Sequence, residues 1–475
     1  MESTQGGGRV LSLQEVGQLG GFRVVGDATF SCVGTDSRRI RPGQLFVALR
    51  GEHFDGHDFV EQAAAEGAAA ALVDEAWQRE HEDIEFPRLV VSDTRFALGT
   101  LAAHWRSRFD IPLIGVTGSN GKTTVKEMCA AIMRAQARHD GHTADCVLAT
   151  TGNLNNDIGL PLTLLEMRDH HRAAVIEMGM NHPGEIGYLT ALARPTVAIV
   201  TNAQRAHLQG MGSLVEIAKE KGAIYGGLGE SGVAVVNADD SHCALWRELN
   251  RGRTVVTFAT GQVADVKAEA DLHGLGARLT LSTSASSVAF DLPVPGEHNV
   301  RNAAGAAAAC LAAGASLAAV VEGLSGFSGA PGRLQRRAGL NGALVIDDTY
   351  NANPDSVRAA IDVLASTAGH TVLALGDMGE VGTTSAQLHD EVGGYAKSKG
   401  VDELYALGEM SAVAAHNFGE GGQKFATAES LLAALAPRLD ANTVVLVKGS
   451  RFMRMERVAN GLAAVHNGAP SQESH

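Results

Sequence analysis

A glycine-rich turn lies between an apolar run and a helix, and this stretch limits the possible folds of the chain more than any other. Residues 111–116 have the length and composition of a buried strand, and the turn Gly-Ser-Asn-Gly follows at residues 118–121. After Lys122 the apolar residues recur at helical spacing, so one face of a helix begins there. The glycines let backbone N–H groups face a polyphosphate, and the helix N-terminus adds the positive end of its dipole. The segment therefore predicts a P-loop that binds a nucleoside triphosphate.

The residues that follow the turn fit the same interpretation. Lys122 is placed to reach the outer phosphates, and the Thr123 hydroxyl can coordinate the accompanying Mg²⁺. The strict pattern G-x-x-x-x-G-K-[ST] is not matched, because five residues separate Gly115 from Gly121. An ordinary glycine-rich turn is the alternative. The Lys-Thr pair between a strand and a helix favours the phosphate site.

Composition limits the classes of protein to which the chain can belong. With 475 residues it is long enough for about three domains. Aromatic residues are scarce, at 5%, which suits closely packed α/β layers better than a β-sandwich. The net charge of −14 argues against broad binding to nucleic acid or to an anionic membrane surface. Five scattered cysteines fit a reducing cytoplasm rather than a disulfide framework or a zinc site.

One uncharged segment has almost the length of a membrane span. Residues 302–321 are mostly alanine, however, and Gly314 interrupts them. We predict a helix that stops at this glycine and a second helix capped by Ser316. The N-terminal residues have neither the basic nor the apolar region of a signal peptide. We expect no membrane insertion.

The order of apolar runs and polar loops predicts three α/β domains. A small first domain covers residues 1–93, and a parallel-sheet domain built around the P-loop covers residues 94–331. A Pro- and Gly-rich hinge at residues 328–332 precedes a third domain, residues 332–475, with the βαβ rhythm of a Rossmann-like sheet. The predicted strands lie at residues 45–49, 69–73, 89–91, 111–116, 173–176, 197–200, 232–237, 344–346, 372–375, 404–407 and 444–447.

Candidate site residues follow the predicted strands of the second domain. The strand at residues 173–176 ends on Glu177, and a carboxylate at a strand end beside a P-loop predicts an Mg²⁺ ligand. The next strand leads to His207, which on the residues alone could equally be a surface loop histidine. Lys219 and Lys221 lie on a predicted helix, where the pattern alone indicates a solvated face.

Polar clusters also follow the predicted strands of the third domain, at residues 347–355, 376–380 and 448–451. Ligands of open α/β sheets bind at the carboxyl ends of the strands. Two such domains therefore suggest a nucleotide enclosed between them. In the first domain, the polar turn at residues 35–39 indicates a solvated loop on the residues alone.

Taken in order, these stretches resemble the Mur ligase family, the ATP-dependent amide ligases of peptidoglycan synthesis. Residues 117–124 have the family's form of the P-loop, which accounts for the unusual glycine spacing. The resemblance extends from Thr35 to about Val458, nearly the whole chain. The branch of the family that adds D-alanyl-D-alanine is the most similar, on the stretches at residues 151–159, 177–186, 347–354, 375–380 and 447–451.

The resemblance implies a role for each candidate residue. The implied ATP contacts are Gly118, Ser119, Asn120, Gly121, Lys122, Thr123 and Thr124 at the phosphates, Asn299 and Asn302 at the adenine, Arg333 at a phosphate and Asp348 at the ribose. The implied Mg²⁺ ligands are Thr123, Glu177, His207 and Lys221, the last as a carbamate formed with CO₂. The implied contacts to the uridine end of the second substrate are Asp36, Ser37 and Arg38. The implied catalytic residues are Lys122, Lys221 and His207.

The resemblance also implies a reaction. The terminal carboxylate of UDP-N-acetylmuramoyl-tripeptide would attack the γ-phosphate of ATP, with two Mg²⁺ ions, and D-alanyl-D-alanine would attack the resulting acyl phosphate. The expected enzyme is cytoplasmic and monomeric and binds no nucleic acid. The alternatives are a relative that adds a single amino acid, a folylpolyglutamate synthetase, and a P-loop switch or transport ATPase. The asparagine-rich loop at residues 151–157 and the stretch at residues 375–380 favour the first reaction.

Overall fold

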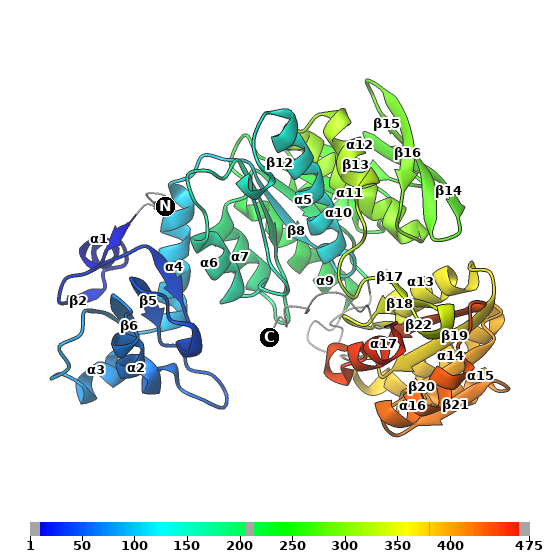
Figure 1. The fold of residues 1–475 in the computed structure, drawn as a ribbon. Helices are drawn as coiled ribbons and strands as arrows, with labels where there is room; N and C mark the ends of the chain where they lie inside the picture. The colour runs from blue at the N-terminus through cyan, green and yellow to red at the C-terminus, as the bar shows by residue number, and fades with distance from the viewer. Residues whose placement is uncertain (1–9, 205–212, 380, 465–475) are drawn as a thin grey trace, which may run out of the picture.

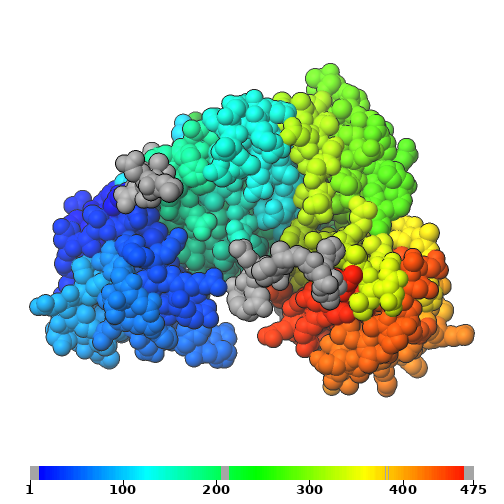
Figure 2. Space-filling model, viewed as in Figure 1, coloured from blue at the N-terminus to red at the C-terminus, as the bar shows by residue number. Residues whose placement is uncertain are grey.

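The computed structural model describes residues 10–204, 213–379 and 381–464. These residues form three α/β units in chain order, and the central unit lies between the other two (Figure 1). Figure 2 shows the first unit, in blue, and the third, in orange and red, on opposite sides of the molecule. The predicted fold class is therefore confirmed, and each predicted strand is present with small displacements at its ends. The division at residues 93/94 and 331/332 stays a prediction.

The described residues of the first unit form a five-stranded sheet in the order β2-β7-β6-β5-β4. The strands β4 to β7 run parallel, and β2 pairs with β7 in the antiparallel direction. Alternate residues of β5 enter different cores, since Leu45 and Phe46 belong to separate apolar clusters. The elements are β1 (Leu11–Ser12), α1 (Leu13–Gly20), β2 (Arg23–Val25), β3 (Thr29–Phe30), β4 (Cys32–Gly34), η1 (Ser37–Arg39), β5 (Gln44–Val47), η2 (Gly56–Phe59), α2 (Val60–Ala65), β6 (Ala70–Asp74), α3 (Glu75–Glu80) and β7 (Arg88–Val91).

The described residues of the central unit form a nine-stranded sheet in the order β16-β15-β14-β13-β12-β11-β8-β10-β9. The strands from β9 to β14 are parallel, and β15 and β16 extend the sheet as an antiparallel edge. The strands are β8 (Leu113–Thr117), β9 (Val147–Ala149), β10 (Ala173–Glu177), β11 (Val197–Val200), β12 (Val233–Asn237), β13 (Thr254–Ala259), β14 (Val266–His273), β15 (Gly276–Thr283) and β16 (Ser287–Leu292). The helices are α4 (Thr94–Ser107), α5 (Lys122–His139), α6 (Gly159–Leu165), α7 (Glu185–Ala193), α9 (Leu214–Gly222), α10 (Cys243–Leu249), α11 (Glu297–Ala312) and α12 (Leu317–Ser325).

The described residues of the third unit form a six-stranded sheet in the order β17-β18-β22-β19-β20-β21, parallel except for β17. The elements are β17 (Gln335–Ala338), β18 (Leu344–Asp348), α13 (Pro354–Ala365), β19 (His370–Gly376), α14 (Ser385–Ser398), β20 (Glu403–Leu407), α15 (Ser411–Phe418), β21 (Gly422–Phe425), α16 (Ala428–Leu435), β22 (Thr443–Lys448) and α17 (Glu456–Leu462). As in the central unit, the carboxyl ends of neighbouring parallel strands meet at one edge of the sheet, where ligands of such folds bind.

The central sheet is covered on both faces. Met128 of α5, Ala307 of α11 and Val320 of α12 share one apolar cluster on the first face. On the other face, Leu101 of α4 and Leu189 of α7 belong to a cluster that also includes residues of the first unit. The helix α4 therefore joins the first and central units through a continuous core.

The alanine-rich segment folds as predicted. The helix α11 ends at Ala312, Gly314 has a φ of +95°, and the Ser316 side chain accepts a hydrogen bond from the Ala319 N–H at the start of α12. Within the described part of the chain, no helix is long and apolar enough to cross a membrane.

Candidate active site

The P-loop joins β8 to α5, and two of its glycines are required by close contacts. Gly118 has a φ of +150°, and a Cβ there would lie 1.8 Å from the Thr201 hydroxyl oxygen. Gly121 has a φ of +81°, and its Cβ would lie 2.5 Å from the side-chain oxygen of Asn302. No other residue fits at either position without displacing its neighbours. The P-loop thus lies against the residue that follows β11 and against α11, with the N-terminal N–H groups of α5 available for phosphate.

The loop after β11 fastens the P-loop. The Ser119 N–H donates to the Asn202 carbonyl oxygen at 2.9 Å, and the Asn120 N–H donates to the Asn202 side-chain oxygen at 3.0 Å. The Thr201 hydroxyl donates to the Asn120 carbonyl oxygen at 2.7 Å. These bonds fix the P-loop backbone before any ligand arrives, so phosphate binding requires little reorganisation.

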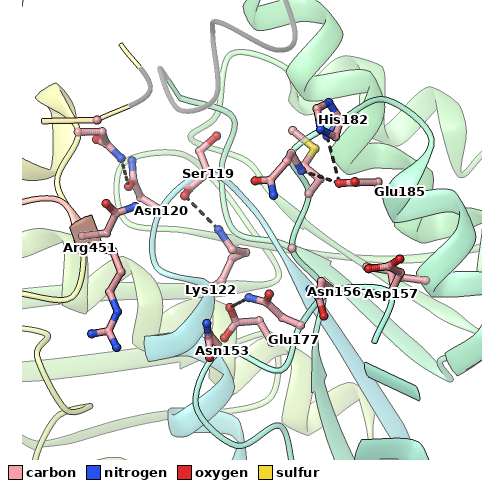
Figure 3. Close-up of a pocket in the computed structure, with 18 of the residues that line it drawn as sticks. Ser119, Asn120, Lys122, Asn153, Asn156, Asp157, Glu177, His182, Glu185 and Arg451 are labelled. Carbon is pink, nitrogen blue, oxygen red and sulfur yellow. Dashed lines mark hydrogen bonds between the residues drawn. The ribbon is translucent and has the colours of Figure 1, made fainter. Parts of the chain in front are cut away.

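Lys122 bends back over the P-loop. Its ammonium donates to the Gly118 carbonyl oxygen at 2.8 Å. It also donates to the Ser119 carbonyl oxygen at 3.3 Å (Figure 3). Thr123 and Thr124 follow in the first turn of α5 and are buried. The ammonium is therefore held over the loop that would carry the phosphates.

Glu177 lies beside the P-loop because β10 pairs in register with β8, Glu177 opposite Val116. Its side chain is buried, and Asn155 donates an amide hydrogen bond of 2.7 Å to Oε1. The other oxygen, Oε2, is buried without a hydrogen-bond partner among the described residues. An unpaired carboxylate oxygen in a buried site is costly, and Mg²⁺ favours such a ligand. Glu177 therefore fits a metal ion.

Lys219 and Lys221 of α9 lie in opposite environments. Lys219 is exposed and forms an ion pair of 2.8 Å with Glu216. Lys221 is 1% exposed, so the solvated face indicated by the pattern is wrong for this residue. Burial first, and then the charge of Lys122, lowers the pKa of Lys221 well below its ordinary value, while Glu220 acts against this shift. A lowered pKa favours the neutral, nucleophilic form of this amine.

Glu220 fixes the orientation of α9. Its two carboxylate oxygens accept hydrogen bonds of 2.9 Å from the N–H groups of Gly184 and Ile186, at the N-terminus of α7. A carboxylate at a helix N-terminus is stabilised by unpaired N–H groups and by the helix dipole. Lys221, the next residue along α9, is thereby held toward the interior.

The two asparagines of α11 form a buried chain beside the P-loop. The Asn302 side-chain amide donates to the Asn299 side-chain oxygen at 3.1 Å, and the Asn299 amide donates to the Pro295 carbonyl oxygen at 2.8 Å. Asn302 lies directly against Gly121, so α11 packs along one side of the P-loop.

The third unit contacts the P-loop directly. The Asn353 amide donates to the Asn120 side-chain oxygen at 2.8 Å, although 233 residues separate them. Arg333 places Nη2 3.4 Å from the Thr123 hydroxyl oxygen, and its guanidinium lies 4.0 Å from the ring centroid of Tyr350. This contact brings a cation of the third unit to the N-terminal end of α5, next to the P-loop.

The two aspartates at the end of β18 are engaged within the third unit. Asp348 accepts a 2.5 Å hydrogen bond from the Lys448 ammonium and another of 3.1 Å from the Leu334 N–H. Asp347 pairs with Arg337 at 3.1 Å. A ribose hydroxyl would therefore have to share the Asp348 carboxylate with Lys448.

A cavity of about 1100 Å³ lies between the P-loop, the loops that follow β9 and β10, and the third unit. Among the predicted site residues, those that line it are Ser119, Asn120, Gly121, Lys122, Glu177 and Arg333. Figure 3 shows the polar side chains of this cavity around Lys122 and Glu177. The cavity is large enough for a nucleotide and part of a second substrate.

Some predicted residues lie elsewhere. Asp36, Ser37 and Arg38 are at the exposed turn η1 of the first unit and do not line the cavity. Arg38 and Asp36 form an ion pair at 2.9 Å, and the Arg38 side chain is 84% exposed. His207 lies outside the described residues, so its predicted role stays untested.

The described residues include no group of three His, Cys, Asp or Glu side chains that could hold a metal ion by themselves. A metal ion beside Glu177 would need oxygen ligands from the Thr123 hydroxyl, from phosphate or from a modified Lys221. This requirement fits an ion that enters with a nucleotide.

Three consecutive parts of the chain match descriptions of one family. Residues 29–106 match "Mur ligase family, catalytic domain", residues 116–310 match "Mur ligase middle domain" and residues 332–451 match "Mur ligase, glutamate ligase domain". A UDP-N-acetylmuramoyl-tripeptide–D-alanyl-D-alanine ligase from Escherichia coli (strain K12) is 42% identical over 92% of this chain and 94% of its own length. The chain belongs to the Mur ligase family.

Solved structures of Mur ligases are similar over nearly the whole chain. MurF from Acinetobacter baumannii superposes with a TM-score of 0.87 at 37% identity, covering 95% of this chain and 98% of that one. MurF from Thermotoga maritima, solved in complex with ADP, gives a TM-score of 0.78 at 28% identity, covering 90% and 96%. The three-unit architecture is therefore that of the family.

The sequence-based assignment of this Mur ligase missed several residues of the cavity. Asn155, Tyr350 and Arg451 line it, and the Arg451 guanidinium lies 5.9 Å from the Tyr350 ring centroid. All three occur in stretches on which the resemblance was based, so the signal for them was present. Arg95 of α4 also lines the cavity and pairs with Asp157 at 3.3 Å, a contact that no sequence pattern indicated.

Proposed function

We propose that this Mur ligase is an ATP-dependent ligase that joins D-alanyl-D-alanine to UDP-N-acetylmuramoyl-tripeptide. Relatives of that name match nearly the whole chain. One observation carries the proposal: the Lys122 ammonium and the buried carboxylate of Glu177 line a cavity to which the third unit contributes Arg333. The arrangement suits transfer of a phosphoryl group inside a polar cavity.

ATP would bind with its phosphates on the P-loop, residues 118–124. The Lys122 ammonium would release the loop carbonyls and bind the outer phosphates, and Arg333 would bind a phosphate from the third unit. Asn299 and Asn302, next to Gly121, are in position for the adenine end. Asp348 is the proposed ribose contact.

Mg²⁺ ions held by Thr123, Glu177, His207 and a carbamate of Lys221 would offset the repulsion between the substrate carboxylate and the triphosphate. The lowered pKa of Lys221 supports the carbamate. Its neutral amine would attack the carbon of CO₂ and lose a proton, which converts a buried amine into a carboxylate-like ligand. The unpartnered Oε2 of Glu177 supports a metal at that carboxylate.

The reaction would proceed in two steps. A carboxylate oxygen of the tripeptide attacks the γ-phosphorus, and the bond from this phosphorus to the bridging oxygen breaks. The products of this step are ADP, which departs, and an acyl phosphate on the tripeptide. The amine of D-alanyl-D-alanine then attacks the acyl carbon, and the tetrahedral intermediate expels inorganic phosphate as the amine loses its proton. Lys122 and the N–H groups of α5 would stabilise the charge that develops on the phosphate oxygens.

The first unit would bind the uridine end of the sugar nucleotide through Asp36, Ser37 and Arg38. This assignment agrees with their exposure on a unit that lies opposite the third (Figure 1). The enzyme would act as a cytoplasmic monomer.

The decisive experiment measures ADP release with UDP-N-acetylmuramoyl-tripeptide, with D-alanyl-D-alanine and with both. We expect sustained release only when both are present, together with a product whose mass is the sum of the two substrates less one water. Equal turnover with a single amino acid in place of the dipeptide would contradict the proposal. ATP hydrolysis that needs neither substrate would indicate an ATPase.

A further inference from the structure

A second lysine on the P-loop helix is completely buried. Lys126 of α5 has 0% exposure and stands one helical turn after Lys122, on the same face of the helix. Its ammonium donates a 2.7 Å hydrogen bond to the Thr150 carbonyl oxygen and pairs with the Glu127 carboxylate. Lysine is among the residue types least often fully buried.

The bond partner of Lys126 is connected to Glu177. Thr150 directly follows β9, a three-residue strand at the edge of the central sheet. Its hydroxyl oxygen accepts a 2.9 Å hydrogen bond from the Glu177 N–H. Five residues further on, Asn155 donates to the Glu177 carboxylate at 2.7 Å. The loop that Lys126 anchors therefore holds Glu177 at both its backbone and its side chain.

A purely structural reading does not account for a charged group at this position. Burying an ammonium has a desolvation cost, and replacing both members of a buried charged pair by apolar groups is often neutral or stabilising. An ammonium adds a directed, charge-assisted bond to a carbonyl oxygen at the end of a short edge strand. That bond couples the helix that carries Lys122 and Thr123 to the loop that aims Glu177.

We propose that Lys126 is a positioning residue that sets the place of the Glu177 carboxylate relative to the P-loop, and with it the affinity for the divalent cation. The proposal rests on the proposed role of Glu177 as a metal ligand. Lys126 itself touches neither nucleotide nor metal. It acts through Thr150 and Asn155, as outer-shell groups commonly orient metal ligands.

The test is equilibrium binding of Mn²⁺ in the presence of a non-hydrolysable ATP analogue, with free Mn²⁺ measured by its EPR signal. Lys126→Met keeps the length of the side chain and removes the ammonium. We expect the Kd for Mn²⁺ to rise about tenfold, while the Tm stays close to that of the wild type. Thr150→Val, which removes the hydroxyl that holds the Glu177 N–H, should raise the Kd in the same direction. In the double variant, the Kd for Mn²⁺ should rise by less than the product of the two single-variant increases, because both residues act through one loop.

Glu127→Gln is the matched control, because it removes the ion pair and leaves the Lys126–Thr150 bond in place. Its Kd for Mn²⁺ should equal that of the wild type. A wild-type Kd in Lys126→Met would overturn the proposal, and if that variant does not fold, a wild-type Kd in Thr150→Val would do so. Glu177→Gln separates the two levels of inference. If it binds Mn²⁺ normally, the metal role of Glu177 is wrong and the role of Lys126 falls with it; if it alone loses binding, the role of Lys126 fails and that of Glu177 stands.

Discussion

The side-chain amide of Asn155 donates a 2.7 Å hydrogen bond to one carboxylate oxygen of Glu177, and the other oxygen is buried without a partner among the described residues. The bond fixes the rotation of the carboxylate and leaves its second oxygen available to bind a ligand. Asn155 comes from the asparagine-rich loop and Glu177 from the end of β10, so the pair forms only when the two loops meet. This pair is the proposed core of the metal site.

Replacing Glu177 by glutamine should separate catalysis from folding. Glu177→Gln keeps the size of the side chain and removes the charge, so we expect turnover to fall by more than about 100-fold, beyond the effect of losing an outer-shell group. The Tm should not decrease, because the variant no longer buries an incompletely paired carboxylate. ADP release and thermal melting on one preparation check both expectations. Turnover near that of the wild type would remove Glu177 from the site.

Lys221 and Lys219 provide a matched pair on one helix. Lys221→Ala should reduce turnover by orders of magnitude, and a small carboxylic acid such as formate should restore part of it by occupying the place of the carbamate. Lys219→Ala removes an exposed ion pair and should change the free energy of unfolding by no more than about 0.5 kcal/mol with full activity retained. The assay is ADP release with and without added acid. An inactive Lys219 variant beside an active Lys221 variant would reverse the assignment.

Substitutions in the turn η1 of the first unit should change the KM for the UDP-substrate and leave the KM for ATP unchanged. Asp36→Ala or Arg38→Ala should raise the KM for the UDP-substrate about tenfold, since a hydrogen bond to a charged group contributes about 1.5 kcal/mol or more. The KM for ATP should not change, because neither residue lines the P-loop cavity. Asp291→Ala, which removes an aspartate from an exposed pair with Arg278 in the central unit, is the control. A selective rise in the KM for ATP would show that the turn belongs to another site.

His171 should make stability depend on pH. Burial, and then the charges of His170 and Arg168, lower the pKa of His171 from 6.5 to about 4, and its Nδ1 accepts a 2.8 Å hydrogen bond from the Arg168 N–H. Between these values the unfolded chain binds a proton that the folded chain does not, so stability is lost as the pH falls from about 6.5 to 4, by an amount on the order of 1–3 kcal/mol.

The substitution His171→Asn tests this expectation, because the asparagine oxygen can still accept the Arg168 N–H but cannot titrate. Denaturant unfolding at a series of pH values should show a smaller loss of stability in this variant than in the wild type. His416→Asn, at an exposed histidine of α15, should leave the slope unchanged. Parallel curves for His171→Asn and the wild type would show that His171 does not carry the effect.

Local sequence determined much of the fold, because backbone conformation depends on near neighbours. The apolar run, the glycine turn and the helix that starts at Lys122 are present as predicted, and Gly314 and Ser316 divide the alanine-rich segment as expected. The three α/β units followed from the alternation of strands and helices. Short edge elements such as β9 were not predicted, because three residues do not carry a recognisable pattern.

Packing between distant segments sets which side chains meet and which are buried. Lys221 lies four residues after the buried Ile217, on the same face of α9, and this spacing indicates burial. The charge of a lysine, by contrast, indicates exposure, so the pattern alone predicted a solvated residue. What turns that face inward is the bond between Glu220 and the start of α7, residues that the sequence places far apart. The contact of Asn353 with Asn120 likewise depends on how the third unit lies against the second. Sequence patterns specify the conformation of each segment, whereas burial, the pKa of Lys221 and the open oxygen of Glu177 arise from packing between segments, which no single segment encodes.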